Sequence, residues 1–405
     1  MLKELFQQEF SKMVAVISSL FGLQHIETAE DIVSETFLQA ADSWGIKGLP
    51  PNPTAWLYTV AKQKTLYHFR RNKLFEKKII PTLTAQQEQS AVMDEDLFSQ
   101  ENIKDSQLQM LFAICDPAIA SEAQIGLALR VLCGFGIDEI AEAFLTNKET
   151  INKRLFRAKE KLRESDVKME LPSVSEIDKR LDNVLHIIYL LFNEGYYSKT
   201  QNRILQKELC FEAMHLGVLL TEWERTNRPK TNALMALMCF HASRLHAREA
   251  NEETLVLYEQ QDERLWDSSL INQGQIFLDL SMQGAELSSY HIEARIACWH
   301  CIKEDNAEKW ADILQLYDQL LLINYSPSVA LNRIFALYKV KGPQEALIEA
   351  EKLKLENYHF YFLLLGELYR SLDPEKARSC FEKAYDLART QAERKSIKEK
   401  IITVE

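Results

Sequence analysis

Residues 136–159 encode two short helices joined by a tight turn: Gly136-Ile-Asp-Glu-Ile-Ala-Glu-Ala-Phe-Leu-Thr-Asn-Lys-Glu-Thr-Ile-Asn-Lys-Arg-Leu-Phe-Arg-Ala-Lys159. Apolar residues recur three or four positions apart, which is the spacing of a helix with one buried face. The turn falls around Thr146-Asn147-Lys148. The pattern predicts a helix-turn-helix. Its inward residues are Ile140, Ala141 and Phe144 on the first helix, and Ile151, Leu155, Ala158 and Leu162 on the second.

The other face of the second helix is polar and basic, with one aromatic residue. Such a face suits the major groove of DNA, where arginine reads guanine and an apolar group meets the thymine methyl. A solvated basic helix packed in a bundle would show the same pattern, so both interpretations stay open at this point. The outward residues are Glu149, Asn152, Lys153, Phe156 and Arg157, with Thr150 and Arg154 on the flanks.

Composition extends the helical prediction to the whole chain. Only 12 glycines and 10 prolines occur in 405 residues, whereas typical usage is about 7% and 5%. Folds that turn often need both residues, so sandwiches, barrels and propellers are disfavoured. The length suggests two or three domains. We therefore expect an all-α protein.

Charge is distributed unevenly. The net charge is -11, which argues against a protein that simply coats nucleic acid. Yet the windows Lys62–Lys78 and Lys148–Arg163 each hold seven basic residues, against one and two acidic ones. This asymmetry predicts two separate anion-binding surfaces on an otherwise acidic protein.

The remaining sequence signals argue against several other classes of protein. Seven cysteines, an odd number, make a disulfide framework improbable and favour a reducing cytoplasm. Cys298-Trp-His-Cys301 has the spacing of half a zinc site, but no second pair completes it, so no metal is expected. No apolar run is long enough to cross a membrane. Since no catalytic motif is found, neither an enzyme activity nor a cofactor is expected.

The amino-terminal segment, residues 1–78, reads as three or four helices. One over Glu27–Trp44 has an inward face that includes Ile32, Val33 and Phe37, and an outward face that includes Glu27, Glu30 and the apolar Leu38. A break over Gly45–Pro53 follows. Asn52 then caps a helix that starts at Pro53. Its basic and aromatic residues suit a melted DNA strand, although cations are also common near helix carboxyl ends. They are Lys62, Lys64, Tyr67, His68, Arg70 and Arg71.

Three further segments complete the predicted organisation. Residues 79–106 are acidic, rich in glutamine and weakly periodic, so we interpret them as a linker. The helix-turn-helix unit spans 107–168, and a long helical region follows from 172 to 405. Near its end, Tyr338, Pro343 and Ala346 are echoed by Tyr369, Pro374 and Ala377, a period of 31 residues close to the tetratricopeptide pattern. Stacked helical hairpins are the expected architecture there.

Taken together, these motifs resemble a known family. Ala29-Glu-Asp-Ile-Val-Ser-Glu-Thr-Phe-Leu-Gln-Ala40, with Pro53-Thr-Ala-Trp-Leu-Tyr-Thr-Val-Ala61 and Arg70-Arg71, resembles the second region of extracytoplasmic-function sigma factors of bacterial RNA polymerase. The helix-turn-helix is similar to their fourth region. The remainder is similar to the helical extension of one subgroup. It carries Phe192-Asn-Glu-Gly-Tyr196, Asp262-Glu-Arg-Leu-Trp266 and Ser328-Val-Ala-Leu-Asn-Arg333. Tyr67-His68 departs from the family, in which an aspartate-containing turn often precedes the double arginine.

The resemblance implies a role for each surface. Asp31, Glu35, Leu38 and Gln39 would dock on core polymerase. The acidic linker would occupy a nucleic-acid channel of the polymerase. The extension would control activity, with a protein or peptide as a possible partner. Contacts to the melted minus-ten element would come from Trp56, Lys62, Lys64, Tyr67, Arg70, Arg71 and Lys73. The minus-thirty-five duplex would be read by Lys148, Thr150, Asn152, Lys153, Arg154, Phe156, Arg157 and Lys159.

The sequence thus predicts a cytoplasmic promoter-specificity subunit that is not itself an enzyme. It would have two small helical domains and a tetratricopeptide-like extension. A stand-alone helix-turn-helix regulator with a ligand- or peptide-sensing helical domain is the alternative. A helical scaffold with no nucleic-acid role is a third reading. The helix with the acidic face, followed by the helix that begins Pro-Thr-Ala-Trp, favours the promoter-specificity subunit. A stand-alone repressor would not need this pair of helices.

Overall fold

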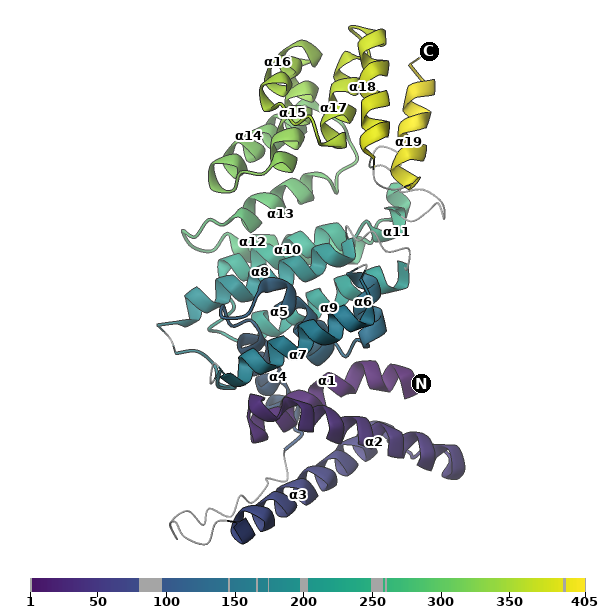
Figure 1. The fold of residues 1–405 in the computed structure, drawn as a ribbon. Coiled ribbons are helices and arrows are strands. Elements are labelled where there is room, and N and C mark those ends of the chain that lie inside the picture. The colour runs from purple at the N-terminus through teal and green to yellow at the C-terminus, as the bar shows by residue number, and fades with distance from the viewer. Residues whose placement is uncertain are drawn as a thin grey trace. The chain divides into compact units, whose positions relative to one another are not determined.

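The computed structural model describes residues 2–79, 97–144, 146–164, 167–173, 175–196, 203–248, 258, 261–388 and 391–404. Within these residues every regular element is a helix and no strand occurs, which confirms the all-α prediction (Figure 1). The chain divides into two compact units, Met1–Thr226 and Asn227–Glu405.

The first unit begins with helices packed around α1. Phe10, Met13 and Ile17 of α1 are fully buried between its neighbours. The break predicted at Gly45 comes three residues later. Helix α2 continues through Gly45, and the chain turns at Gly48, whose positive φ of 76° suits glycine. These helices are α1 (Leu2–Phe21), the short η1 (Leu23–His25), α2 (Ile26–Lys47) and α3 (Pro53–Ile79).

The start of α3 matches the sequence prediction. The side chain of Asn52 accepts a hydrogen bond from the Ala55 backbone N–H at 3.0 Å, and Pro53 occupies the first helical position. Leu57, Val60 and Ala61 are buried, as their spacing predicts. The helix extends to Ile79, six residues past Lys73, the last of the predicted minus-ten residues.

The predicted helix-turn-helix is present in the same unit. Ser99 accepts a hydrogen bond from the Asn102 N–H at 3.2 Å and so caps α4. The last residues of the expected linker, from Gln100, are therefore helical, and residues 80–96 of it lie outside the described residues. The helices are α4 (Gln100–Ile114), α5 (Ser121–Leu127), the π-helical turn η2 (Ala128–Leu132), α6 (Ile137–Ala143) and α7 (Lys148–Glu164).

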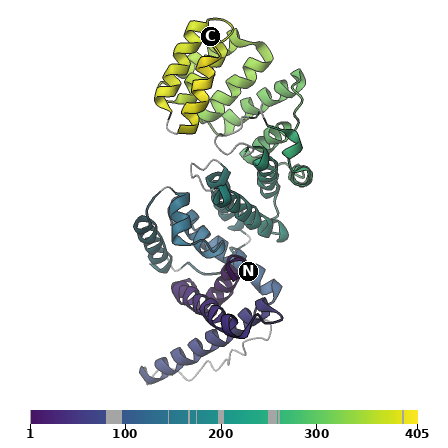
Figure 2. The ribbon, with the colours of Figure 1, turned by 90° about the vertical axis from the view of Figure 1, so that its right-hand side faces the viewer.

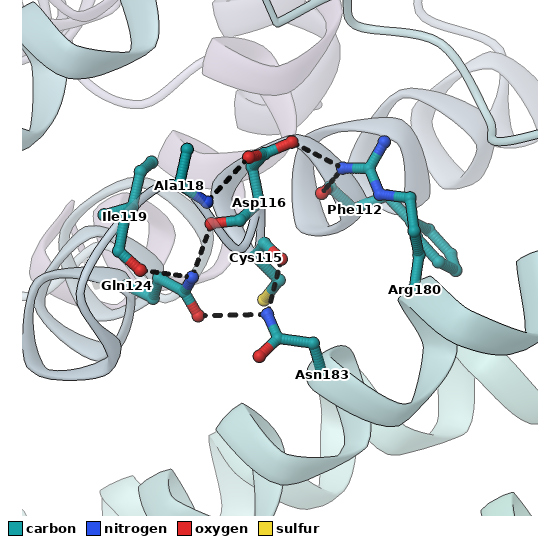
Figure 3. A network of polar contacts seen from close by, with 8 residues as sticks. All are labelled: Phe112, Cys115, Asp116, Ala118, Ile119, Gln124, Arg180 and Asn183. Carbon is teal, nitrogen blue, oxygen red and sulfur yellow. Dashed lines mark hydrogen bonds and ion pairs between the residues drawn. The ribbon is translucent and has the colours of Figure 1, made fainter. Parts of the chain in front are cut away.

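Two helices of the expected extension, α8 (Ile177–Tyr196) and α9 (Arg203–Glu222), complete the first unit. Figure 3 shows how side chains of α8 reach the carboxyl end of α4. Arg180 donates to the carbonyl oxygen of Phe112 at 2.7 Å and pairs with Asp116 at 3.3 Å. Asn183 donates to the carbonyl oxygen of Cys115 at 2.6 Å. These bonds satisfy carbonyls that a helix end leaves without partners.

The second unit starts with α10, which is buried on nearly every side. Towards the carboxyl terminus of the second unit, successive helices pack in antiparallel pairs. The last two, α18 and α19, run side by side and are yellow in Figure 2. The helices are α10 (Pro229–Ala242), α11 (Leu245–Arg248), the short η4 (Glu263–Leu265), α12 (Ser268–Ser281), α13 (Ser289–Trp299), α14 (Ala307–Ile323), α15 (Pro327–Lys341), α16 (Pro343–Leu353), α17 (His359–Tyr369), α18 (Pro374–Leu387) and α19 (Gln391–Ile402).

The 31-residue repeat maps onto two successive helix pairs. Pro343 and Pro374 each occupy the first position of the second helix in a pair. Ala346 and Ala377, one turn later, are fully buried. Small residues at these positions let the paired helices approach closely, which is the packing that stacked repeats require.

Candidate nucleic-acid interface

Helix α7 has the two faces that its sequence predicts. Ile151, Leu155, Ala158 and Leu162 are buried against the rest of the first unit. The helix begins where the side chain of Asn147 accepts the Thr150 N–H at 2.8 Å. On the other face Phe156 is 54% exposed, which is unusual for a ring of this size. Thr150, Asn152, Lys153 and Arg157 are exposed with it.

Three other predicted DNA-contacting cations of α7 take part in ion pairs within the unit. Lys148 pairs with Asp138 of α6 at 2.5 Å, and both side chains are largely exposed. Arg154 pairs with Glu122 of α5 at 3.0 Å and lies over the Phe144 ring. Exposed pairs of this kind stabilise a protein by about 0–1 kcal/mol, so DNA phosphate can compete for these cations.

Lys159 lies in a different environment. Its Nζ is 2.5 Å from Glu30 of α2, and the two side chains are only 12% and 9% exposed. Arg130 of η2 approaches the other oxygen of Glu30 at 3.3 Å. The sequence pattern puts Glu30 on the solvent face of its helix, but Glu30 is buried because these two cations neutralise it. Arg163, one turn further along α7, pairs with Glu27 at 2.5 Å. The carboxyl end of α7 is thereby attached to α2.

The predicted docking residues form an open stripe on α2. Asp31, Glu35, Leu38 and Gln39 are all exposed, and Leu38 is 66% exposed. Their spacing of three and four residues puts them on one helical face. An apolar side chain in the middle of an acidic stripe is suited to contact with another protein. Glu35 also pairs with Lys64 of α3 at 3.1 Å, so a predicted docking residue contacts a predicted DNA-binding one.

The predicted minus-ten residues lie along α3. Trp56 packs edge-on against Trp44 of α2, with ring centroids 5.4 Å apart. Tyr67 is 68% exposed, whereas His68 packs against Phe21 instead of pointing outward. Lys62 is half-buried. The side chains of Arg70, Arg71 and Lys73 lie outside the described residues, although the helix that carries them continues to Ile79.

Two features of this interface do not follow from the sequence pattern. Ile46, in the last turn of α2, and Leu49, in the turn between α2 and α3, are 87% and 50% exposed. Their signal was present as two apolar residues inside a break rich in glycine and proline. The contact of Glu30 with Lys159 had no comparable signal, because it joins residues 129 positions apart.

An acidic pocket of about 200 Å³ lies elsewhere in the first unit. It is lined by α1, by the turn before α6, by the first turn of α6 and by α9. Glu139 accepts a hydrogen bond from the Gly136 N–H at 2.7 Å. Burial, with the charge of Glu208, raises the pKa of Glu212 to about 7, although Lys12 opposes the shift. The lining residues are Gln8, Cys133, Gly134, Phe135, Glu139, Glu208 and Glu212.

The two cysteines of the half zinc motif contact other groups of the second unit. The thiol of Cys298 lies 3.6 Å from Gln275 Oε1, and that of Cys301 lies 3.7 Å from the Phe240 carbonyl oxygen. Burial raises the pKa of both thiols. The described part of the chain holds no group of three potential metal ligands.

Among the described residues, no helix is both long and apolar enough to cross a membrane.

Two segments of the chain match known protein families. Residues 5–75, which carry α2 and most of α3, match sigma-70 region 2. Residues 180–282 match a family of unknown function, DUF6596. An uncharacterized protein of Rhizobium meliloti (strain 1021) is 32% identical over 378 residues, which cover 91% of this chain and 88% of that protein. The chain belongs to the same family as this Rhizobium protein, with a sigma-70 region 2 as its first domain. No solved structure shows a significant match.

Sigma-70 region 2 implies binding to core RNA polymerase and to promoter DNA. The match covers both the exposed stripe of α2 and the aromatic pair of Trp44 and Trp56. It ends before α7, so the role of the helix-turn-helix rests on the geometry of its own exposed face.

Proposed function

We propose that the protein is a sigma factor of the extracytoplasmic-function type that directs core RNA polymerase to specific promoters in the cytoplasm. It acts by binding, not by catalysis. Its tetratricopeptide-like helical domain, which follows the helix-turn-helix, modulates this activity, with a protein or peptide as a candidate partner. The observation that carries the proposal is a sigma-70 region 2 in the same chain as a second exposed basic helix, α7.

Each surface has a distinct part in this proposal. The stripe of Asp31, Glu35, Leu38 and Gln39 docks on polymerase, and its apolar Leu38 is the expected centre of affinity. Helix α3 and the turn before it hold the melted minus-ten strand, because aromatic rings stack on bases while cations hold phosphates. The outward face of α7 lies in the major groove of the minus-thirty-five element, where Arg157 and Phe156 read base edges.

The DNA-reading part is tested by charge reversal on α7. The variant Lys153→Glu/Arg157→Glu changes two exposed residues, and Lys168→Glu/Lys179→Glu makes the same change at exposed lysines outside α7. In run-off transcription with core polymerase, the first variant should lose at least about tenfold in initiation, since each lost contact costs about 1–3 kcal/mol. The control should match the unmodified protein. Equal activities of the two variants would contradict the assignment.

The docking part is tested separately. The variant Asp31→Lys/Leu38→Asp alters the stripe, and Glu101→Lys reverses one exposed acidic residue on α4 as a control. We expect the stripe variant to fail to co-elute with core polymerase in size exclusion while keeping its melting temperature, because exposed substitutions rarely change stability by more than about 0.5 kcal/mol. Retained co-elution argues against the stripe. DNA binding by a protein that never binds polymerase would instead support a stand-alone regulator.

A further inference from the structure

Helix α2 contacts both of the helices that the proposed function assigns to promoter DNA. Lys159 of α7 pairs with Glu30 at 2.5 Å, and Lys64 of α3 pairs with Glu35 at 3.1 Å. The two glutamates lie five residues apart on α2, which is a rise of about 8 Å along the helix axis. One short stretch of α2 therefore holds both DNA-binding helices.

The contact between α7 and α2 consists of two sets of ion pairs with different burial. Glu30 is shared by Lys159 and by Arg130, which approaches its other oxygen at 3.3 Å, and the Glu30 side chain is 9% exposed. One turn further along α7, Arg163 pairs with Glu27 at 2.5 Å, and both of these side chains are partly exposed. Since Lys159 is a predicted minus-thirty-five contact, its pair with Glu30 withholds it from DNA phosphate.

Apolar contacts join the same two parts of the chain. Val16 of α1 is buried with Leu97 and Ile103, and Tyr58 of α3 stacks on Phe98 with ring centroids 5.0 Å apart. Val16 and Tyr58 belong to sigma-70 region 2, whereas the other three residues lie just before or within α4, the first helix of the helix-turn-helix unit. Separation of the two parts would expose these side chains to water, so the packed arrangement is favoured in the free chain.

The spacing of the promoter elements does not fit this arrangement. Elements centred about 10 and about 35 base pairs before the start site are about 85 Å apart, because B-form DNA rises about 3.4 Å per base pair. Helices α3 and α7 have 27 and 17 residues and are therefore about 40 and about 26 Å long. Even end to end they would not reach from one element to the other. Two helices held on the same stretch of α2 cannot contact both elements at once.

We propose that the ion pairs between α7 and α2 hold the free protein in a closed state that cannot occupy both promoter elements. Opening separates the helix-turn-helix from sigma-70 region 2 and releases Lys159 from Glu30. This inference rests on the proposed function, because it concerns the regulation of the same two DNA-binding surfaces. When only the open fraction of a protein can bind, its apparent affinity is reduced by that fraction. Weakening the pairs between α7 and α2 should therefore increase initiation, although it removes native contacts.

The partly exposed pair of Glu27 and Arg163 allows a charge-swap test, since neither residue is a proposed polymerase or DNA contact. Glu27→Arg and Arg163→Glu each bring two like charges together, and the double variant restores an attractive pair with the signs exchanged. In run-off transcription with core polymerase and a limiting amount of the protein, each single variant should initiate about two- to fivefold more often than the unmodified chain, the range expected for an exposed ion pair. The double variant should return to the unmodified rate.

The two single variants also control for attraction to DNA. They change the net charge in opposite directions, so a gain that both share cannot come from a more positive protein. Single variants that are no more active than the unmodified chain would overturn the inference. So would a double variant that is as active as the single ones.

A reversible cross-link tests the closed state directly. In Glu27→Cys/Arg163→Cys, a bis-maleimide with a cleavable disulfide spacer joins the two introduced thiols, and the unmodified chain, with its seven cysteines, receives the same treatment as a control. The linked protein should lose at least about tenfold in initiation from promoters with both elements and recover when a reductant cleaves the spacer. It should still bind a duplex that carries the minus-thirty-five element alone, because Phe156 and Arg157 stay exposed. Equal initiation before and after cleavage would overturn the inference.

These experiments separate the closed state from the proposed function. If the unmodified protein initiates with core polymerase but neither the charge swap nor the cross-link has an effect, the closed state is wrong and the sigma-factor role stands. If neither the unmodified protein nor the single variants initiate at any promoter of its own genome, the proposed function is wrong and this inference is wrong with it.

Discussion

The first unit contains an ion pair that is buried between two helices, whereas the ion pairs between the carboxyl-terminal repeat helices of the second unit are partly exposed. Glu30 of α2 contacts Lys159 and Arg130, and Arg180 of α8 contacts Asp116, so charged groups join the helices of the first unit. In the repeats, Gly366 lies against the Phe381 ring and alanines lie at the helix contacts. Charged contacts depend on their partners and on pH, whereas close packing depends on shape. The two parts of the molecule should therefore respond differently to substitution.

The largest expected effect is at the buried contact between α2 and α7. Glu30→Gln removes the carboxylate charge that Lys159 and Arg130 share, and it leaves the Lys159 ammonium, which is only 12% exposed, without that charge. Loss of one partner from a buried ion pair costs about 3–5 kcal/mol, so the free energy of unfolding should fall by that amount in urea titration. The matched control is Glu27→Gln, which breaks the partly exposed pair with Arg163. It should cost less than about 1 kcal/mol. Similar losses in the two variants would mean that burial does not distinguish these contacts.

A smaller effect, with a defined pH dependence, is expected at the acidic pocket. The pKa of Glu212 is raised to about 7 in the folded protein, from an ordinary value of 4.5. Folding therefore favours the protonated form. The contribution of Glu212 is most favourable below pH 4.5 and is lost as the pH rises towards 7, by at most about 3 kcal/mol.

The variant Glu212→Gln should remove this pH dependence. It should be more stable than the unmodified protein at pH 8 and differ little from it at pH 4.5, in unfolding experiments at both values. A stability difference that is the same at both pH values would show that the carboxyl group does not titrate in this interval.

The smallest effect is expected in the repeats. A Cβ atom added to Gly366 would lie 2.5 Å from the ring of Phe381, which is fully buried and cannot move away freely. Overpacking of this kind costs about 1–3 kcal/mol, partly offset by the gain of about 1 kcal/mol in helix propensity. We expect Gly366→Ala to lower the melting temperature of the chain.

Gly45 provides the control for that substitution. It lies in α2 with nothing within 4 Å of an added Cβ atom, so Gly45→Ala should keep only the gain in propensity and raise stability slightly. Adding Phe381→Leu to Gly366→Ala should recover part of the loss if the ring is the cause. If Gly366→Ala proves as neutral as Gly45→Ala, the repeats do not depend on close approach at this position.

Most of the helices and their buried faces could be predicted from sequence, because both follow from local rules. The spacing of Ile151, Leu155 and Ala158 gave the inward face of α7, and Asn52-Pro53 gave the start of α3. The ends of helices were less well predicted. Helix α2 passes through Gly45, since a glycine weakens a helix but need not end it.

What the sequence by itself determined is the all-α class, the helix-turn-helix, the exposed stripe with Leu38 and the two basic windows. All of these depend on residues within a few turns of one another. Only the tertiary structure decided which cations remain open to a ligand. Lys153 and Lys159 look alike in the sequence, yet one is exposed and the other is paired with Glu30. Electrostatic interactions depend on distance in space and on burial, and a local sequence pattern specifies neither.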